Sequence, residues 1–283
     1  KAAHGGVAVY QPGRDESHLR QLQLMTDLRQ AISGGQLELK FQPKLDAASA
    51  HVQHVEALLR WRHPTLGAVA PDEFIPLAER SGFIHELTRF VLDQALACHA
   101  VWRAGGLDLG LAVNLSAMDL LDADLPDYIE QRLAAHGVPA ERLILEVTES
   151  RLSDSTTASL ENLVRLRVQR FGLSIDDFGT GHSSLAQLRD IPFTELKVDR
   201  GFVRGARANP IVRPILEGSI EMAKRLGMQS VAEGVETEDD WRLLQEVGCD
   251  LAQGYFIGRP MAGDQVVDWL QAWSARRPAL IAR

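Results

Sequence analysis

Residues 143–178, LILEVTESRLSDSTTASLENLVRLRVQRFGLSIDDF, contain two short apolar runs separated by a longer amphipathic segment. The runs Leu143–Thr148 and Leu173–Asp177 are dominated by aliphatic residues, which is typical of buried strands. Between them, Ser155–Arg170 has the apolar spacing of a helix. A strand, a helix and a second strand in this order predict a unit in which the two strands are parallel.

The same alternation extends along most of the chain. Further strand-like runs are Leu37–Leu45, Val52–Trp61, Leu109–Leu115, Glu195–Val198, Gln229–Ala232 and Leu251–Ile257. Helical patterns between them include Ile84–Ala104, Ile211–Leu226 and Glu238–Val247. Eight strands alternating with helices predict an α/β protein with a TIM-like (β/α)8 barrel. A doubly wound open sheet is the alternative, but its glycine-rich phosphate loop is missing.

The first two predicted strands are joined by a short connection. A parallel pair needs a crossover of a dozen or more residues, and residues 46–51 cannot supply one. We therefore expect the first strand to lie antiparallel to the others. Before it, residues 14–36 are predicted to form a linker helix, which Asp15 or Ser17 would cap and Gly34-Gly35 would end. Residues 1–13 are interpreted as the tail of a preceding domain or as a disordered tail, and residues 37–283 as the barrel.

Composition excludes several classes of protein. The 283 residues are 45% hydrophobic and 24% charged, as in globular proteins, and the net charge of −8 argues against nucleic-acid binding. No run approaches the roughly 20 apolar residues of a membrane span, and no signal peptide is visible. We therefore expect a cytoplasmic location without direct membrane contact. Cys98 and Cys249 are read as buried thiols in a reducing compartment, although a disulfide is the alternative.

Polar residues gather where the predicted strands end, and barrel enzymes carry their chemistry at that rim. They are Glu56, Arg60, Asn114, Glu146, Glu149, Asp176, Asp177, Lys197, Asp199, Glu233, Glu236 and Gln253. Each alone could face solvent or cap a turn. Barrel strands are buried on both faces, however, and burying several unpaired carboxylates costs many kcal/mol. The group as a whole therefore predicts a shared cleft.

The cleft has more carboxylates than cations. Arg60 and Lys197 are the only basic residues that the sequence places near them. Oxygen-rich clusters of this kind suit Mg²⁺ or Mn²⁺, and two such ions could hold a phosphodiester and activate water. Arg60 could then hold a phosphate oxygen, and Lys197 could orient or deprotonate the attacking water.

Several of these residues belong to motifs that resemble those of the EAL-domain family. The motifs are Val55–Trp61 (VEALLRW), Asn114–Ser116, Glu146–Ser150, Asp176–Gly181 (DDFGTG), Leu196–Arg200, Ala232–Thr237 and Gln253–Tyr255. They occur in order between about Leu37 and Met261. The resemblance implies a TIM-like barrel with an antiparallel first strand and hydrolysis of cyclic di-GMP to linear pGpG.

The resemblance also implies roles for individual residues. Glu56, Asn114, Glu146 and Asp176 would bind one metal ion, and Asp176 and Asp177 a second, with Glu233 beside it. The catalytic residues would be Lys197, Glu56, Glu233 and Gln253. The substrate would contact Gln42, Arg60, Asp199 and Glu236. Glu149 would anchor a loop that couples dimerisation to metal binding and includes Phe178, Gly179, Thr180 and Gly181.

Cofactors and partners follow from the same resemblance. Two Mg²⁺ or Mn²⁺ ions are expected in each active site, with Ca²⁺ inhibitory because of its looser coordination. A homodimer is implied, and the first residues resemble the end of a GGDEF domain, so GGDEF and sensor domains could precede this segment. His182 and Gly201 depart from the residues common in the family. A non-catalytic cyclic di-GMP receptor and a glycosidase are the competing interpretations, and metal-dependent turnover separates both from the phosphodiesterase.

Overall fold

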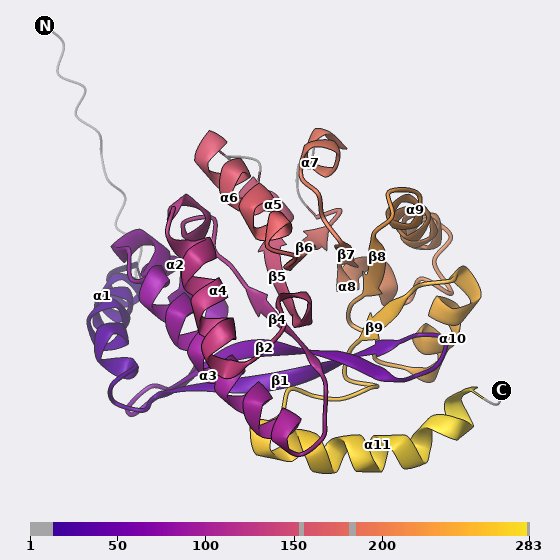
Figure 1. Ribbon diagram of the computed structural model, residues 1–283, viewed down its shortest axis with the longest axis horizontal. Coiled ribbons are helices and arrows are strands. Elements are labelled where there is room, and N and C mark those ends of the chain that lie inside the picture. The colour runs from indigo at the N-terminus through magenta and orange to yellow at the C-terminus, as the bar shows by residue number, and fades with distance from the viewer. Residues whose placement is uncertain (1–13, 153–155, 181–184, 282–283) are drawn as a thin grey trace, which may run out of the picture.

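A closed barrel of eight strands forms the centre of the computed structural model, which describes residues 14–152, 156–180 and 185–281. The barrel strands are β1 (Leu37–Asp46), β2 (Val52–His63), β4 (Gly110–Asn114), β5 (Leu143–Thr148), β6 (Gly172–Phe178), β7 (Glu195–Val198), β8 (Gln229–Ala232) and β9 (Leu251–Gln253). Strand β1 pairs with both β2 and β9, which closes the ring (Figure 1). A short strand, β3 (Gly67–Val69), extends β2 as a hairpin.

Strand direction agrees with the prediction. Strand β1 is antiparallel to both neighbours, whereas the pairs from β2 through β4 to β9 are parallel. The connection at residues 47–51 is a tight turn in which Ala50 has a φ of 55°. The TIM-like fold with a reversed first strand is therefore confirmed.

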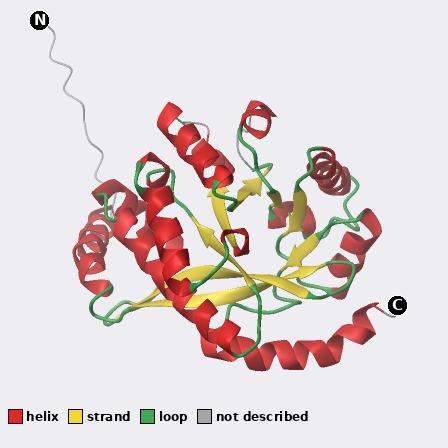
Figure 2. Cartoon of the chain, viewed as in Figure 1, coloured by secondary structure: helices red, strands yellow, loops and turns green. Residues whose placement is uncertain are grey.

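Helices cover the outside of the barrel (Figure 2). They are α1 (Arg14–Ala31), α2 (Pro71–Ser81), α3 (Ile84–Ala104), α4 (Leu125–His136), α5 (Glu149–Leu152), α6 (Thr157–Val168), α7 (Leu185–Asp190), α8 (Arg200–Val203), α9 (Val212–Arg225), α10 (Glu238–Val247) and α11 (Val266–Ile281). Short 3-10 turns occupy Asp119–Leu121, Ala140–Arg142 and Gly263–Gln265. Trp273 on α11 donates a hydrogen bond to the carbonyl of Ala50, so α11 closes the end of the barrel near the β1–β2 turn.

Some element boundaries differ from the sequence predictions. Strand β9 ends at Gln253 instead of Ile257, and β3 was not predicted. The backbone is already helical at Arg14, so Asp15 and Ser17 lie within helix α1 and not at the predicted position before its first turn. Residues 1–13 lie outside the described part of the chain, and the predicted division into tail, linker helix and barrel stays a prediction.

Two further sequence expectations concern the thiols and the membrane. Cys98 and Cys249 are both free thiols, as predicted, but only Cys249 is buried, whereas Cys98 is partly exposed. Within the described ranges, no helix combines the length and apolarity that crossing a membrane requires.

The two faces of the barrel strands carry different residues. On β6, Leu173 and Ile175 are fully buried in the apolar layer, whereas Ser174 and Asp176 alternate with them. Because side chains alternate along a strand, these polar residues face the barrel interior. The arrowheads of β5 and β6 point toward the side on which α5 and α7 lie, so their carboxyl ends meet at one rim (Figure 1).

Candidate active site

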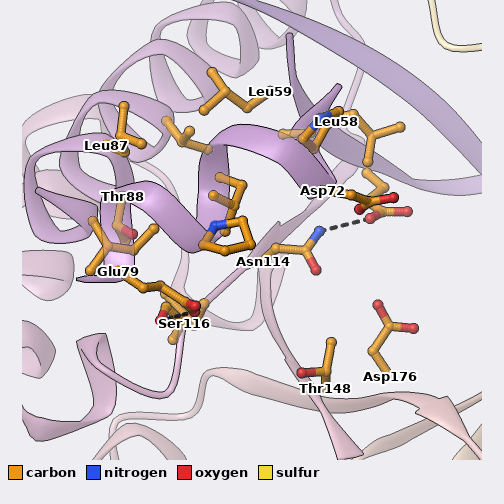
Figure 3. A pocket seen from close by; sticks show the side chains of 18 of the residues that line it. Leu58, Leu59, Asp72, Glu79, Leu87, Thr88, Asn114, Ser116, Thr148 and Asp176 are labelled. Atoms are coloured by element: carbon orange, nitrogen blue, oxygen red, sulfur yellow. Dashed lines mark hydrogen bonds between the residues drawn. The ribbon is translucent and has the colours of Figure 1, made fainter. Parts of the chain in front are cut away.

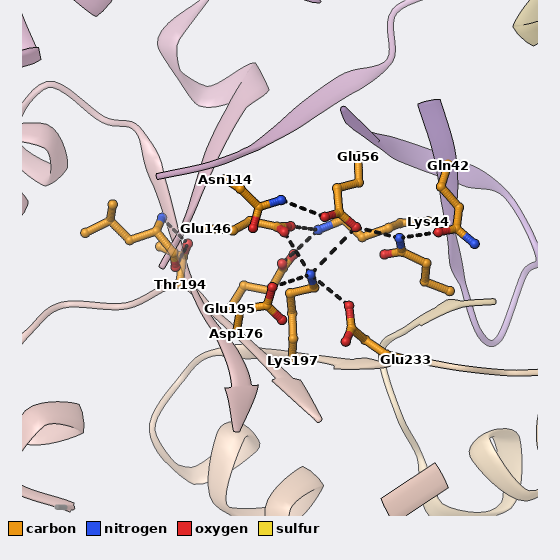
Figure 4. Close-up of polar contacts among 12 residues, drawn as sticks. Gln42, Lys44, Glu56, Asn114, Glu146, Asp176, Thr194, Glu195, Lys197 and Glu233 are labelled. Atoms are coloured by element: carbon orange, nitrogen blue, oxygen red, sulfur yellow. Dashed lines mark hydrogen bonds and ion pairs between the residues drawn. The ribbon is translucent and has the colours of Figure 1, made fainter. Parts of the chain in front are cut away.

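Lys197 on β7 lies at the centre of a ring of carboxylates. Its ammonium nitrogen Nζ is 2.8 Å from a carboxylate oxygen of Glu146 and 2.8 Å from one of Glu233. Asp176 is 3.1 Å away and Glu56 3.7 Å away. Figure 4 shows these side chains converging on Lys197 from several strands. The structure thus brings together the four acidic residues that the sequence placed at separate strand ends.

The end of β6 brings two adjacent carboxylates to the same site. Asp177 has a φ of 55°, a left-handed conformation that is uncommon for residues other than glycine. This turn ends the alternation of side chains, so Asp177 does not point away from Asp176 as it would in a regular strand. Oxygens of Asp176, Asp177 and Glu233 lie within 4.8 Å of one another. Such a group of hard oxygen donors fits a divalent cation.

Two amide side chains complete the set of oxygen donors. Asn114 and Gln253 donate hydrogen bonds to the two oxygens of Glu56, at 2.8 and 2.7 Å. Since their nitrogens are committed to Glu56, the amide oxygens are the atoms they can offer to a metal or water. The Oε1 atom of Gln253 is buried without a hydrogen-bond partner among the described residues. An orphaned acceptor beside a carboxylate ring is further support for a cation site.

Burial and charge shift the protonation of these groups. Burial raises the pKa of Glu56 to about 7 and that of Glu233 to about 8, with neighbouring carboxylates adding to both shifts. For Glu146, burial is outweighed by Lys197 and Lys44, which together lower its pKa to about 2. Burial opposes the charge of Lys197, but the surrounding carboxylates keep its pKa well above the ordinary value. Lys197 is therefore a protonated donor and not a base in the metal-free site.

These shifts predict how stability and metal binding depend on pH. The pKa values of Glu56 and Glu233 exceed the 4.5 of an exposed glutamate, so the folded metal-free chain binds more protons than the unfolded chain between about pH 4.5 and 8. Its stability should therefore fall as pH rises through that window. Mg²⁺ competes with the same protons, so its stabilising effect should grow. Thermal melts with Mg²⁺ and with chelator at pH 5.5, 7 and 8.5 measure both trends. An equal Mg²⁺-induced shift at all three pH values would contradict the prediction.

Two pockets meet at the carboxylate ring. One, of about 620 Å³, is bordered by Gln42, Asp199 and Glu236. The other, of about 430 Å³, is bordered by Arg60 and by apolar residues of α2 and α3. Both volumes fall in the range of ligand pockets. Both pockets are lined by Glu56, Leu58, Asp72, Asp176 and Asp177. The cleft therefore extends to both sides of the ring.

The smaller pocket is lined by both polar and apolar side chains. Figure 3 shows Asn114 and Asp176 at one end, and Leu87 with the polar residues Thr88, Glu79 and Ser116 at the other. Its floor includes Leu115 and the prolines at the start and middle of α2.

The four predicted substrate contacts lie at different places on the rim. Gln42 is buried, donates to the carbonyl of Gly258 at 3.1 Å and accepts a hydrogen bond from Gln253. Asp199 caps α8 by accepting a hydrogen bond from the backbone of Gly201. Glu236 forms an ion pair with Arg204. Arg60 borders the smaller pocket, so the structure separates it from Glu236 across the ring.

The loop after β6 is tied to the site by Glu149. This carboxylate is 1% exposed and accepts a hydrogen bond from the backbone of Gly179 at 2.7 Å. Gly179 has a φ of 95°, and a Cβ there would lie 2.8 Å from the ring of Phe202. Phe178 is buried, and the Thr180 hydroxyl donates to the carbonyl of Asp177. Gly181 and His182 lie outside the described residues, and the proposed link of this loop to dimerisation stays a prediction.

Gly254, which follows Gln253, packs so closely against the backbone of Val235 that a larger residue does not fit at this position. A Cβ on Gly254 would lie 2.2 and 2.3 Å from backbone atoms of Val235. Gly254→Ala should therefore push the Gln253 and Val235 segments apart and lower the free energy of unfolding by about 2–4 kcal/mol. Urea titration measures the change. Gly218→Ala is the matched control, because nothing lies within 4 Å of a Cβ there. Equal stability of the two variants would contradict the packing argument.

Sequence reasoning missed a second buried lysine beneath the ring. Lys44 and Glu195 form an ion pair at 2.8 Å, and Lys44 also contacts Glu146 at 3.0 Å. The alternation of side chains along the strands could have identified Lys44 and Glu195 as inward-facing residues. Lys44 is two residues from Gln42, and Glu195 two residues from Lys197, so each shares the inward face of its strand.

Comparison with known proteins agrees with this geometry. The model of the EAL domain family matches residues 25–260. Cyclic di-GMP phosphodiesterase PA2567 of Pseudomonas aeruginosa is 40% identical over 267 residues, covering 94% of this chain and 46% of the relative. The bifunctional diguanylate cyclase/cyclic di-GMP phosphodiesterase MucR of the same organism is 41% identical over 263 residues, covering 93% of this chain and 38% of the relative.

A solved structure of the MucR phosphodiesterase in complex with c-di-GMP has a similar fold. Its TM-score is 0.81 at 43% sequence identity, and the match covers 86% of this chain and 99% of that one. This chain spans less than half the length of the two curated relatives described above. The family match covers most of the barrel and every described strand end that contributes to the carboxylate ring. The chain belongs to the EAL domain family.

Proposed function

We propose that this chain hydrolyses one phosphodiester bond of cyclic di-GMP to give linear pGpG, using two Mg²⁺ or Mn²⁺ ions. The observation that carries the proposal is the carboxylate ring around Lys197, which contains Glu56, Glu146, Asp176 and Glu233, with Asp177 and Asn114 beside it. Relatives at 40 and 41% identity are named as cyclic di-GMP phosphodiesterases. A module that only binds the nucleotide would not need this ring.

The donors divide between two ion positions. Glu56, Asn114, Glu146 and Asp176 would hold one ion, and Asp176 and Asp177 would hold the other, with Glu233 next to it. Together the ions would supply positive charge to the phosphate oxygens and activate the attacking water. This also accounts for an acidic cleft that binds an anionic substrate, because the site holds the five carboxylates Glu56, Glu146, Asp176, Asp177 and Glu233, and Lys197 is the one lysine at the ring among the described residues.

Side chains would orient the water, bind the phosphate and hold the metal ligands in place. Lys197, kept protonated by its neighbours, would donate hydrogen bonds that orient the water for attack along the line of the breaking bond. Arg60 would hold a phosphate oxygen at the edge of the smaller pocket. Gln253 would fix Glu56 through the 2.7 Å hydrogen bond.

The two pockets suit the two halves of a cyclic dinucleotide. They lie on either side of the ring, so one guanosine could enter each pocket while the scissile phosphate lies at the centre. Glu236 and Arg204 border the larger pocket. A glutamate accepts hydrogen bonds, so Glu236 is suited to the N–H groups of a guanine edge.

Assay of the purified chain with cyclic di-GMP tests this proposal. We expect linear pGpG with Mg²⁺ or Mn²⁺, none with chelator, and inhibition by Ca²⁺, which is larger and less strict in geometry. Tight nucleotide binding without turnover under all metal conditions would reassign the chain as a receptor. Turnover that survives chelation would refute the metal site.

A homodimer and an upstream GGDEF domain complete the proposal. The bifunctional relative MucR is named for both activities, and this chain matches only 38% of its length. Light scattering on the purified chain, with and without Mg²⁺, measures the oligomeric state. A monomer under both conditions would remove the dimer from the proposal without affecting the hydrolysis.

A further inference from the structure

Lys44 is a fully buried lysine that the proposed chemistry does not use. It comes from the reversed strand β1, and its side chain is 0% exposed. Its ammonium donates to Glu195 on β7 at 2.8 Å and to Glu146 on β5 at 3.0 Å. Figure 4 shows the side chains of Lys44 and Lys197 reaching the carboxylates from two different directions. One lysine thus joins three strands across the barrel interior.

Glu146 is held from two sides by the two lysines. Its Oε1 atom accepts from Lys44 and its Oε2 atom from Lys197. Lys197 also contacts Asp176, Glu233 and Glu56, so its charge is shared among four carboxylates. Among the described residues, Lys44 pairs with only two carboxylates, those of Glu146 and Glu195. The Oε1 atom of Glu146 is therefore held by Lys44, and its Oε2 atom by Lys197.

Glu195 neutralises the charge of Lys44, with which it forms an ion pair in the barrel interior. Its register partner on β6 is Ser174, which in turn pairs with Glu146 on β5. Ser174 and Glu195 thus lie two residues before Asp176 and Lys197, one step below the ring and in register with the ring member Glu146. Replacing a buried ion pair by apolar residues of similar size is often neutral or stabilising. Stability alone is thus a weak reason for placing a lysine and a glutamate here.

We propose that Lys44 is a positioning residue for Glu146. It holds Oε1, so that Oε2 faces the ring where a metal ion would bind, while Glu195 neutralises Lys44. This inference rests on the proposed function, because it takes Glu146 as a metal ligand. Partners that orient a ligand from behind typically contribute 10–100-fold to metal affinity or activity.

Three variants separate positioning from stability. Lys44→Met alone leaves Glu195 buried without a cation and should lower the melting temperature. Lys44→Met combined with Glu195→Leu removes both charges and should restore the melting temperature in chelator. Glu195→Gln alone keeps Lys44 on Glu146. The surface pair Glu221 and Arg225 on α9, both changed to Gln, is the matched control for removing one ion pair.

The readouts are the melting temperature in chelator, the Mn²⁺ dissociation constant from calorimetry, and turnover of cyclic di-GMP. The double variant at 44 and 195 should fold like the wild type, yet bind Mn²⁺ about 10–100-fold more weakly and turn over correspondingly more slowly. Glu195→Gln and the surface control should keep Mn²⁺ affinity within a few-fold of the wild type.

Two results would overturn the inference alone. One is a double variant with wild-type Mn²⁺ affinity and turnover, since Lys44 would then only support the fold. The other is a Glu195→Gln variant that folds but loses as much affinity as the double variant, or as Lys44→Met if the double variant does not fold. The loss of Mn²⁺ affinity would then depend on the summed charge of Lys44 and Glu195 and not on the contact between Lys44 and Glu146. A wild-type chain that neither binds Mn²⁺ nor hydrolyses the substrate would instead refute the proposed function, and the inference with it.

Discussion

Lys197→Met is expected to lower kcat for cyclic di-GMP hydrolysis by about 10²–10⁴-fold while changing KM little. The methionine fills the same space but has no proton to donate to the attacking water. The substitution should not lower the affinity for Mn²⁺, in contrast to its effect on kcat. The Lys197 ammonium lies 2.8–3.7 Å from four carboxylates and repels a cation placed among them. Mn²⁺ affinity should therefore stay the same or increase.

The two readouts together separate three roles for this lysine. A large rise in KM with unchanged kcat would make Lys197 a phosphate clamp. Loss of Mn²⁺ affinity would mean that it organises the carboxylates. Only a fall in kcat with retained Mn²⁺ affinity agrees with a role at the water. Lys224→Met on the last turn of α9 is the matched control, because it changes the same residue types away from the ring.

The fold was predictable because its signals are local. The apolar run Leu143–Thr148 coincides with β5, since a strand buried on both faces is apolar almost throughout, and the predicted strand Gln229–Ala232 coincides with β8. The reversed direction of β1 followed from one length, that of the connection at residues 47–51. The end of β9 was misjudged because Gly254 and its neighbours continue the apolar run without pairing to another strand.

The candidate site was predictable as a set of residues but not as an arrangement. Glu56, Glu146, Asp176 and Glu233 could be selected because each is a carboxylate in or directly after a strand that is buried on both faces. The hydrogen bonds that orient them depend on which residues meet across the barrel. Lys44 and Glu146 are 102 residues apart, and no local pattern connects them. The ion pair between Arg204 and Glu236 depends in the same way on the packing of two loops.

The electrostatics of the metal-free site bear on a question that the sequence left open for Lys197. A lysine near water can act as a base only if its pKa falls to near neutrality. Burial pushes the pKa of Lys197 down, but four nearby carboxylates outweigh burial and keep it well above the ordinary value. Of the two roles considered from the sequence, orienting the water is therefore the one that the electrostatics favour.

Glu56→Ala is expected to abolish metal-dependent hydrolysis, with a loss of at least about 10³-fold, and to leave the barrel folded. Glu56 accepts hydrogen bonds from Asn114 at one oxygen and from Gln253 at the other. Its removal therefore takes away one proposed ligand and releases two amides that it holds. Mn²⁺ affinity should fall by more than the 10–100-fold typical of an orienting partner.

Stability should respond to the same substitution in a different way. Burial raises the pKa of Glu56 to about 7, so at pH 8 the folded metal-free chain contains an ionised carboxylate in an unfavourable place. Removing it offsets part of the loss of two hydrogen bonds, each of which is worth about 1 kcal/mol net. The melting temperature in chelator at pH 8 should consequently change little, whereas the increase that Mn²⁺ gives the wild type should disappear. Glu217→Ala on the exposed face of α9 is the control for a lost surface glutamate. If the Glu56→Ala variant is folded and still hydrolyses cyclic di-GMP at the wild-type rate, Glu56 is not a ligand, and the division of the donors between two ions must be redrawn without it.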